Sequence, residues 1–383
     1  MHRVNLVIHV PQNMDTGRGI PKFVINLLDT IDKNAFSITL IQSNWTIYKR
    51  IDYMSYTKNL EKLDDIITYE DRTTKVNFLM KNKFTSFFVY LIFKPLLMRF
   101  DRYLLPLECK QKLKTADLVY LTSNYYSSYA KYNSSTIGSC HTLFVKYGII
   151  GLLMSSLLKS GLIYRFPYVH SFPGYEHYFK RPKTMVFTVP LGINTSIYKP
   201  NSRLPQTKIK LLYVATLEKG KGFDIVLQIS EIMDSTKYEL HVAGAGPMEN
   251  EISRNIVFHG PLSEQELAAL YRNSDIFVYP TRSDTYGTVI LEALSSGLVV
   301  ITSVVVKGIF DVYEKAGYLE YCPLKPSMMY NAIEELSAEL PSYDEKLKIH
   351  KLVEEKNDSR KVSCELESKL LSIAKGRILS EKS

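Results

Sequence analysis

Cysteine is scarce in this sequence, and the spacings that hold metal ions are absent. Four cysteines occur in 383 residues, far from one another, and none belongs to a Cys-x-x-Cys or Cys/His zinc pattern. We therefore expect reduced thiols in a cytosolic protein, without a structural zinc. The sequence also lacks an Asp-x-Asp motif, which could hold a divalent cation.

Long apolar runs are missing as well. The longest uninterrupted one, FFVYLIF at 87–93, is far shorter than the roughly 18 residues of a membrane-spanning helix. The first strand-like run, VNLVIHV, leads into polar PQNMDTGRG rather than the small residues of a signal-peptide cleavage site. We expect no spanning helix and no cleaved leader, and hence a cytoplasmic protein.

The composition is that of an ordinary globular protein, at 45% hydrophobic and 23% charged residues. Its length favours two domains. The net charge of +9 is uneven, because residues 1–200 carry 26 Lys/Arg and 13 Asp/Glu, and residues 201–383 carry 22 and 26. The first part is thus +13 and the second −4. A basic half favours an anionic partner, and nucleic acid, anionic lipid and phosphorylated substrates all remain open.

Apolar runs alternate with helical patterns in the C-terminal half. KIKLLYVAT, YELHVAG, NIVFHG, DIFVYP and LVVITSVV are typical of buried strands, and PMENEISRN of a short helix between two of them. Ser263 and Glu266 predict a capping box at a further helix. This alternation predicts a doubly wound parallel sheet, in which ligands bind at the carboxyl ends of the strands. The N-terminal half begins in the same way, a Pro- and Gly-containing joint follows at 189–200, and residues 342–383 are charged and helical.

The stretch SDTYGTVILEALSSG, residues 283–297, follows one of these strands. We expect its helix to start near Thr285, with Asp284 or Thr285 as N-cap. Thr288, Glu292 and Ser295 then share one face, which fits either a solvated stripe or a ligand site.

Two more polar loops favour the ligand site. VATLEKGKGFD (214–224) places Lys219 and Lys221 after one strand, and VAGAGPMEN (242–250) is a Gly-rich turn after another. Helix N-termini bind anions through their N–H groups, and Gly287 allows a ligand close to the backbone. Taken alone, the lysine loop fits a solvated basic turn as well, and Gly244-Ala245-Gly246 fits a tight turn better.

With these motifs the chain resembles the GT-B glycosyltransferases, specifically glycosyltransferase family four, the "group 1" retaining enzymes. The acid–seven residues–acid pattern is matched by Asp284 and Glu292, with Tyr286-Gly287 inside it. Residues 215–224, GAGP at 244–247, VPLGINTSIYKP at 189–200 and TGRGIPKFVINLL at 16–28 are similar to further family segments.

This resemblance implies a GT-B fold: two Rossmann-like, doubly wound parallel-sheet domains that face a cleft. The acceptor domain would span 1–190, with a C-terminal helix at about 365–383 packing back on it. The nucleotide-sugar donor domain would span 191–364.

The resemblance also implies roles for single residues. Glu292 would bind the ribose hydroxyls, Lys221 would stabilise the leaving diphosphate, and Asp284 would hold the sugar and diphosphate. The remaining donor-binding positions are Gly17, Gly19, Thr216, Gly244, Gly246, and the backbone N–H groups of Tyr286, Gly287 and Thr288. His141 occupies the place of a catalytic histidine near the sugar, and a structural role fits it equally well.

Two positions depart from the family pattern. Ala215 and Thr216 stand where the family has Gly-Arg, and Thr cannot grip phosphate as an Arg fork does. Arg18, Lys219 and Arg282 are candidates to replace that Arg. The first acid is Asp284 rather than Glu, one methylene shorter.

Residues 81–106 form a basic amphipathic segment. Its apolar side chains follow helical spacing from Phe84 to Ile92, with lysines and arginines around them. The segment fits an anionic membrane surface, and it fits a core helix of the first domain equally well.

We therefore expect a retaining, metal-independent glycosyltransferase. It would use no cofactor and would take a nucleotide sugar, such as a UDP- or GDP-sugar, as substrate. The acceptor would be lipid-linked or a polysaccharide. Thr216 keeps open a non-catalytic nucleotide-sugar-binding relative, and the pI of about 9.0 keeps open a remoter nucleic-acid-binding protein, for which no recognition motif is present.

Overall fold

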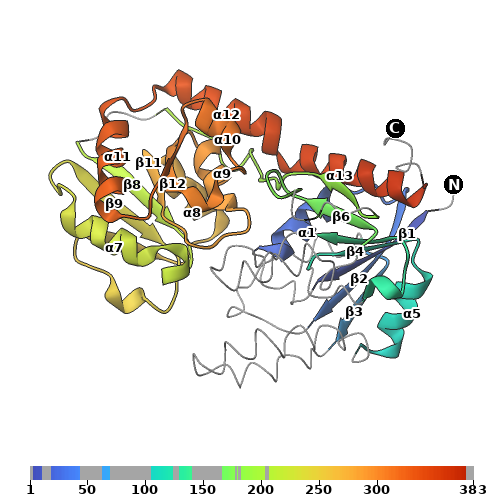
Figure 1. Cartoon of the computed structure of the whole chain (residues 1–383). Coiled ribbons are helices and arrows are strands. Elements are labelled where there is room, and N and C mark those ends of the chain that lie inside the picture. Colours follow the sequence, from blue (N-terminus) through green and yellow to red (C-terminus); the bar gives the residue numbers. More distant parts are fainter. Residues whose placement is uncertain are drawn as a thin grey trace. The chain divides into compact units, whose positions relative to one another are not determined.

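The computed structural model divides into two compact units (Figure 1). Unit 1 comprises Met1–Pro190 and Arg360–Ser383, and unit 2 comprises Leu191–Ser359. The chain therefore passes between the units twice. The structure describes residues 3–10, 19–43, 63–69, 105–123, 129–139, 166–176, 179, 183–202 and 207–376.

Unit 1 is built on a seven-stranded parallel sheet with the order β3-β2-β1-β4-β5-β6-β7. Nearly every residue of the central strands is buried, as expected for a sheet covered on both faces. In chain order the strands are β1 (Val4–Val10), β2 (Phe36–Ser43), β3 (Asp65–Tyr69), β4 (Leu118–Leu121), β5 (Thr136–Ser139), β6 (Tyr168–Ser171) and β7 (Met185–Thr188).

The helices described in unit 1 are α1 (Ile20–Thr30), α5 (Leu107–Thr115) and α13 (Ser359–Ala374). The last of these comes from the far end of the sequence. Its apolar residues Val362, Leu366, Leu370 and Ile373 recur at helical spacing and join the core cluster of β1, β2 and α1. Unit 1 therefore completes its core with residues that follow unit 2 in the chain.

Unit 2 holds a six-stranded parallel sheet with the order β10-β9-β8-β11-β12-β13. The strand order reverses between β8 and β11, and ligands of doubly wound sheets bind at such a point. The two parallel-sheet α/β domains predicted from the sequence are thus confirmed. The strands are β8 (Ile209–Val214), β9 (Tyr238–Ala243), β10 (Ile256–Gly260), β11 (Ile276–Tyr279), β12 (Val299–Ser303) and β13 (Leu319–Cys322).

Helices connect these strands. The capping box is present at α8, where the Glu266 amide donates to Ser263 Oγ and the Ser263 amide donates to Glu266 Oε2. The short helix expected over PMENEISRN is present as a 3-10 helix of three residues. The helices of unit 2 are η6 (Lys219–Lys221), α7 (Phe223–Ile232), η7 (Glu249–Glu251), α8 (Glu264–Arg272), α9 (Thr288–Ser295), η8 (Val304–Val306), α10 (Asp311–Lys315), α11 (Pro326–Ala338) and α12 (Tyr343–Asn357).

Candidate functional site

The three polar loops of the sequence all leave the carboxyl edge of the unit 2 sheet. Residues 215–222 follow β8, residues 244–248 follow β9, and residues 280–287 follow β11. Since β8 and β11 are neighbours, the lysine loop and the loop before α9 flank the reversal in strand order. Backbone hydrogen bonds join these two loops, because the amides of Arg282 and Ser283 both donate to Gly220 O.

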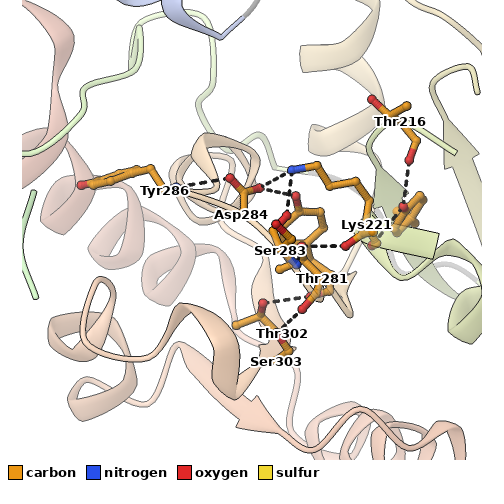
Figure 2. Close-up of polar contacts among 11 residues, drawn as sticks. Thr216, Lys221, Thr281, Ser283, Asp284, Tyr286, Thr302 and Ser303 are labelled. Carbon is orange, nitrogen blue, oxygen red and sulfur yellow. Dashed lines mark hydrogen bonds and ion pairs between the residues drawn. The ribbon is translucent and has the colours of Figure 1, made fainter. Parts of the chain in front are cut away.

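Lys221 and Asp284 form the charged centre of this edge (Figure 2). Lys221 Nζ lies 2.9 Å from Asp284 Oδ2 and 3.3 Å from Ser283 O. Their side chains are 25% and 16% exposed, so the pair is partly screened by solvent but remains accessible. The structure therefore brings together two of the three residues expected to be catalytic.

Three tyrosines hold the two residues of this ion pair in place. Tyr279, at the end of β11, donates to Asp284 Oδ2 at 2.5 Å, and the Tyr286 amide donates to Asp284 Oδ1 at 3.2 Å. Tyr213, on β8, donates to Lys221 O at 3.2 Å and thereby fixes the turn that carries the lysine. Sequence reasoning missed Tyr213 and Tyr279, because both belong to apolar strands; a hydroxyl near the end of a strand is the only sequence signal.

The charge of Asp284 is stabilised by these neighbours. Burial is the largest single influence and raises the pKa of this carboxyl, but the Lys221 ammonium, the Tyr279 hydroxyl and the Tyr286 amide together outweigh it. The net result is a pKa of Asp284 below its ordinary value. Tyr279 is affected oppositely, since burial and the nearby Asp284 carboxylate raise its pKa well above the usual range. At neutral pH the pair is therefore Lys⁺ and Asp⁻.

Helix α9 begins later than the sequence predicts. Its N-cap is Gly287, in the left-handed conformation at φ 80°, and its first residue is Thr288. The prediction of Asp284 or Thr285 as N-cap is therefore wrong: Asp284 instead accepts from the Tyr286 amide in the preceding turn. The first turn of a helix leaves N–H groups without partners inside the helix, so the backbone at Gly287 and Thr288 faces the loop as an anion-binding end.

Glu292 is buried within α9, not exposed on a solvated stripe. Its side chain is 4% exposed and accepts a hydrogen bond of 3.3 Å from the hydroxyl of Tyr271 on α8. Ser295 is also fully buried, so the solvated interpretation of this face is wrong. A carboxylate in such surroundings is costly unless it has polar partners, and Tyr271 supplies one that the sequence reasoning missed.

Gly244 and Gly246 are required by packing between two loops. A Cβ on Gly244, where φ is 134°, would lie 2.0 Å from Ala215 O, and one on Gly246 would lie 2.5 Å from Leu217 O. The turn after β9 thus rests on the backbone of the loop after β8. The two glycines therefore allow the turn after β9 to pack closely against the lysine loop, in agreement with the tight-turn interpretation.

Thr216 stands at the position of the family's Arg. Thr216 offers its carbonyl to the Tyr213 hydroxyl at 3.4 Å. Arg282, a candidate replacement, instead makes a two-pronged ion pair with Asp224, with N–O distances of 2.5 and 2.9 Å. Lys219 is exposed on η6. Arg282 is thus engaged with α7.

Several expected positions lie outside the described residues: Gly17, Arg18, His141 and nearly all of 81–106. Gly19 is described, at φ 62°, and it caps α1. His241 and His259 lie on β9 and β10 with their rings stacked, as strand residues. In the described part of the chain no group of three or more potential ligands could hold a metal ion, and no helix has the length and apolarity to cross a membrane.

A known family matches unit 2. The profile described as "Glycosyl transferases group 1" matches residues 208–339, from β8 through α11. This range contains all three loops of the site. The coarser part of the resemblance, to group 1 glycosyltransferases, is thus supported for this segment.

Two curated relatives align with part of the chain. Sulfoquinovosyl transferase of Arabidopsis thaliana is 26% identical over 127 residues, covering 29% of this chain and 24% of the relative. Alpha-monoglucosyldiacylglycerol synthase of Streptococcus pneumoniae is 34% identical over 102 residues, covering 24% and 23%. The aligned part thus spans about a quarter of the length of these relatives.

Solved structures resemble the whole chain. Sucrose-phosphate synthase from Thermosynechococcus elongatus superposes with a TM-score of 0.69 at 15% identity, over 98% of this chain and 100% of the other. Anabaena HepE in complex with UDP and glucose gives 0.66 at 11% identity, over 97% and 100%. At such identities the likeness establishes the GT-B type of fold and nothing beyond it.

Proposed function

We propose that this protein is a glycosyltransferase that moves a sugar from a nucleotide-diphosphate sugar to an acceptor hydroxyl. The observation that carries the proposal is the Lys221–Asp284 pair at the reversal in strand order, beside the N-terminus of α9. A cation, a carboxylate with its bonded Tyr279 hydroxyl, and a helix N-terminus come together there. This combination suits a ligand that has both phosphates and sugar hydroxyls.

The residues fit the charge changes of the reaction. As the bond between the sugar C1 and the diphosphate oxygen breaks, negative charge grows on the diphosphate and positive charge on the sugar. Lys221 and the first-turn N–H groups of α9 would stabilise the diphosphate, while Asp284 would orient sugar hydroxyls. The acceptor oxygen forms the new bond to C1, and its proton leaves with the diphosphate. Because cation and helix dipole already serve the leaving group, we propose a metal-independent reaction.

Glu292 is proposed to bind the ribose. Its carboxylate follows one turn inside α9, where the Tyr271 hydroxyl holds one of its oxygens. A carboxylate can accept hydrogen bonds from several donors at once, which suits the two hydroxyls of a ribose. UDP is the first donor nucleotide to test, because the similar Anabaena protein was solved in complex with UDP and glucose.

The finer features are also proposals. We propose a retaining reaction of the family-four type, with hexose as the transferred unit and a lipid-linked or polysaccharide acceptor of the cell envelope. The name of the 34% identical relative, a monoglucosyldiacylglycerol synthase, supports a lipid-linked acceptor. A cytoplasmic protein bound peripherally to the membrane through 81–106 fits this acceptor.

The proposal is tested first by nucleotide binding. UDP, GDP, ADP and their sugars are compared by thermal shift on the wild type, on Glu292→Gln and on the matched control Glu231→Gln, an exposed glutamate of α7. A ligand at 100 times its Kd adds about 2.7 kcal/mol of stability. We expect one nucleotide to stabilise the wild type and the control selectively, and Glu292→Gln much less. Absence of stabilisation by every nucleotide at millimolar concentration would overturn the proposal.

Transfer is measured next, with radiolabelled donor and a lipid extract. Adding EDTA checks metal independence, and the anomeric configuration of the product by NMR checks retention. A second candidate function, nucleotide-sugar binding without turnover, is favoured by Thr216 and by the engagement of Arg282 with Asp224. It predicts stabilisation by nucleotide but neither transfer nor donor hydrolysis.

A further inference from the structure

The two passages of the chain between the units are paired with each other inside unit 2. Residues 191–195 follow the first passage and residues 357–359 precede the second. The Ile193 amide donates to Asn357 O at 2.9 Å, and the Ser359 amide donates to Ile193 O at 2.8 Å, forming an isolated parallel bridge. Thr195 Oγ1 adds a bond of 2.5 Å to Asp358 Oδ2. We call these two segments the crossing pair.

Asn357, the last residue of α12, joins the crossing pair to the loop before α9. Its Nδ2 donates to Leu191 O at 2.8 Å and to the Tyr286 hydroxyl at 3.2 Å, and its Oδ1 accepts from the Tyr313 hydroxyl at 2.7 Å. One buried amide thus links four segments: the end of α12, the first passage, α10, and the loop before α9 (residues 280–287), which we call the donor loop. A buried amide is costly unless all its groups are bonded, and here each of its two polar atoms is bonded.

Tyr286 leads from this amide into the candidate site. Its ring is buried against Phe310, with ring centroids 5.6 Å apart, while its own backbone amide holds Asp284 Oδ1 (Figure 2). A connected path therefore leads from the crossing pair to the ion pair. It runs from Asn357 to the Tyr286 hydroxyl, through the tyrosine itself to its backbone amide, and from there to Asp284 and Lys221. On the Asn357 side, this path passes through the hydroxyl of Tyr286.

The segment that follows the first passage also forms hydrogen bonds with α8 and α9. Ser295 Oγ, on α9, donates to Tyr198 O at 2.5 Å, and Arg272, on α8, donates to Ile197 O at 3.2 Å. The segment leading out of the crossing pair is thus bonded to the helix that carries Glu292 and to the helix that carries its partner Tyr271. Glu292, the proposed ribose contact, therefore lies on a helix that is bonded to the first passage.

We propose that Asn357 is a positioning residue that couples nucleotide binding at the donor loop to the crossing pair through the Tyr286 hydroxyl. This inference rests on the proposed function, since the crossing pair responds to nucleotide bound at that proposed site. Nucleotide that orders the 284–288 loop also orders the crossing pair, and a loosened crossing pair weakens nucleotide binding by the same factor, because coupling between two sites is reciprocal.

The experiment is hydrogen exchange of the full chain with and without saturating UDP, with GDP and ADP as parallel arms. The amides of Ile193 and Ser359 report the crossing pair, and the amides at the start of α9 report the site itself. Tyr286→Phe removes only the linking hydroxyl and leaves Asn357 bonded to Leu191 and Tyr313. The matched control is Tyr238→Phe, which removes a hydroxyl bonded to Ser337 on α11.

In the wild type and the control, we expect nucleotide to slow exchange of the crossing amides about 5-fold or more, the lower end of typical coupling. In Tyr286→Phe the slowing falls below about 2-fold although α9 is still protected, and the nucleotide Kd rises about 5-fold. Asn357→Leu, a second variant, loses the response and exchanges rapidly at Ile193 even without nucleotide.

Three results would overturn the inference. Crossing amides that ignore nucleotide while α9 is protected refute the coupling and leave the proposed function standing. Equal slowing in Tyr286→Phe and wild type refutes the hydroxyl as the link. If no nucleotide protects α9 in the wild type, the proposed function itself fails and the coupling falls with it.

Discussion

The two sheets reverse their strand order in the same way, yet their carboxyl edges differ in chemistry. In unit 2, the reversal between β8 and β11 is flanked by Lys221, Asp284 and the N-terminus of α9. In unit 1, the reversal lies between β1 and β4, and its described residues are neutral. The His9 ring on β1 bonds to the Tyr69 hydroxyl at 2.8 Å, and the Thr122 hydroxyl donates to His9 O.

Burial keeps the two described histidines of the unit 1 strands uncharged. Full burial lowers the pKa of His9 to about 3, and burial lowers the pKa of His170, bonded to Tyr120, to about 4. Both rings are therefore neutral at physiological pH. The strand ends nearby carry small buried hydroxyls at Ser43, Thr122, Ser123, Ser139 and Ser171.

Among the described residues, the same strand order therefore carries two different sets of side chains. The charged, partly exposed pair of unit 2 suits a diphosphate, whereas the buried hydroxyls and neutral histidines described in unit 1 suit groups that exchange hydrogen bonds without charge. The predictions below test this division, from the largest expected effect to the smallest.

Removing the cation of the unit 2 edge should have the largest effect. Lys221→Met should lower kcat for transfer by about 10²–10³-fold, the loss found when a preorganised charge-stabilising group is removed. The measurement is steady-state transfer with radiolabelled donor. Lys219→Met, an exposed lysine of the same turn, should retain activity within about 2-fold. Equal losses in both variants would mean that general positive charge, rather than the Lys221 position, is what matters.

The loss of unfolding free energy on replacing a glycine by alanine should differ between the two units. Gly244→Ala would place a Cβ 2.0 Å from Ala215 O, so we expect about 3 kcal/mol of destabilisation from overpacking and backbone strain together. Gly19→Ala in unit 1 meets no heavy atom within 4 Å among the described residues, so its cost should come from the backbone conformation alone, φ 62° and ψ −122°, at about 1–3 kcal/mol. Urea unfolding measures both. A Gly244 variant as stable as the Gly19 variant would show that the two loops of unit 2 relax easily.

Acid should act on the two edges at different pH. His9 is neutral when folded, with a pKa of about 3, and protonates near pH 6.5 when unfolded. Its contribution to stability is therefore present above about pH 6.5 and is lost as pH falls, at up to about 1.4 kcal/mol per pH unit. His9→Gln should reduce the slope of unfolding free energy against pH between about 6.5 and 4.5. An unchanged slope would mean that His9 is not buried in its neutral form.

Asp284 provides the contrast in unit 2. Its folded pKa lies below the ordinary value, so its stabilising contribution is present above about pH 4 and is lost as pH falls through the folded pKa. The stability difference between wild type and Asp284→Asn should thus stay constant from about pH 7 to 5 and shrink only below about pH 4. A difference that already shrinks near pH 6.5, the ordinary pKa of histidine, would place the titration on a histidine.

The smallest effect is expected from a single hydroxyl of the unit 1 edge. Tyr69→Phe removes the bond to His9 and should cost about 1 kcal/mol in unfolding free energy. Nucleotide affinity, measured by calorimetry, should stay within about 2-fold of the wild type. A tenfold weaker affinity would break the division between the two edges.

Much of this architecture could be predicted from the sequence because it depends on strong, regular signals. Continuous apolar strands alternating with helical patterns indicate a parallel sheet, and Ser263 with Glu266 forms a capping box at the expected place. Lys221 and Asp284 could be paired because loops at adjacent strand ends meet at one edge.

The remainder depends on tertiary contacts that a sequence does not display. The pattern misplaces the start of α9 because Asp284 is a good N-cap residue, but its carboxylate is taken by Lys221 and Tyr279. From its spacing, Glu292 fits a solvated stripe, but in the folded protein it is buried and bonded to Tyr271. Tyrosines in apolar strands look like core residues because only the fold shows where their hydroxyls end.

The contribution of α13 to unit 1 has a consequence for how the chain matures during translation. Residues 191–359 are synthesised as an uninterrupted stretch and form a unit of their own. Unit 1 must wait, because Leu366 and Leu370 leave the ribosome only after all of unit 2 has been made. Until then β1 and α1 expose the apolar surface that α13 later covers. The first part of the protein to be synthesised is therefore the last to be finished, and its apolar surface stays exposed until α13 arrives.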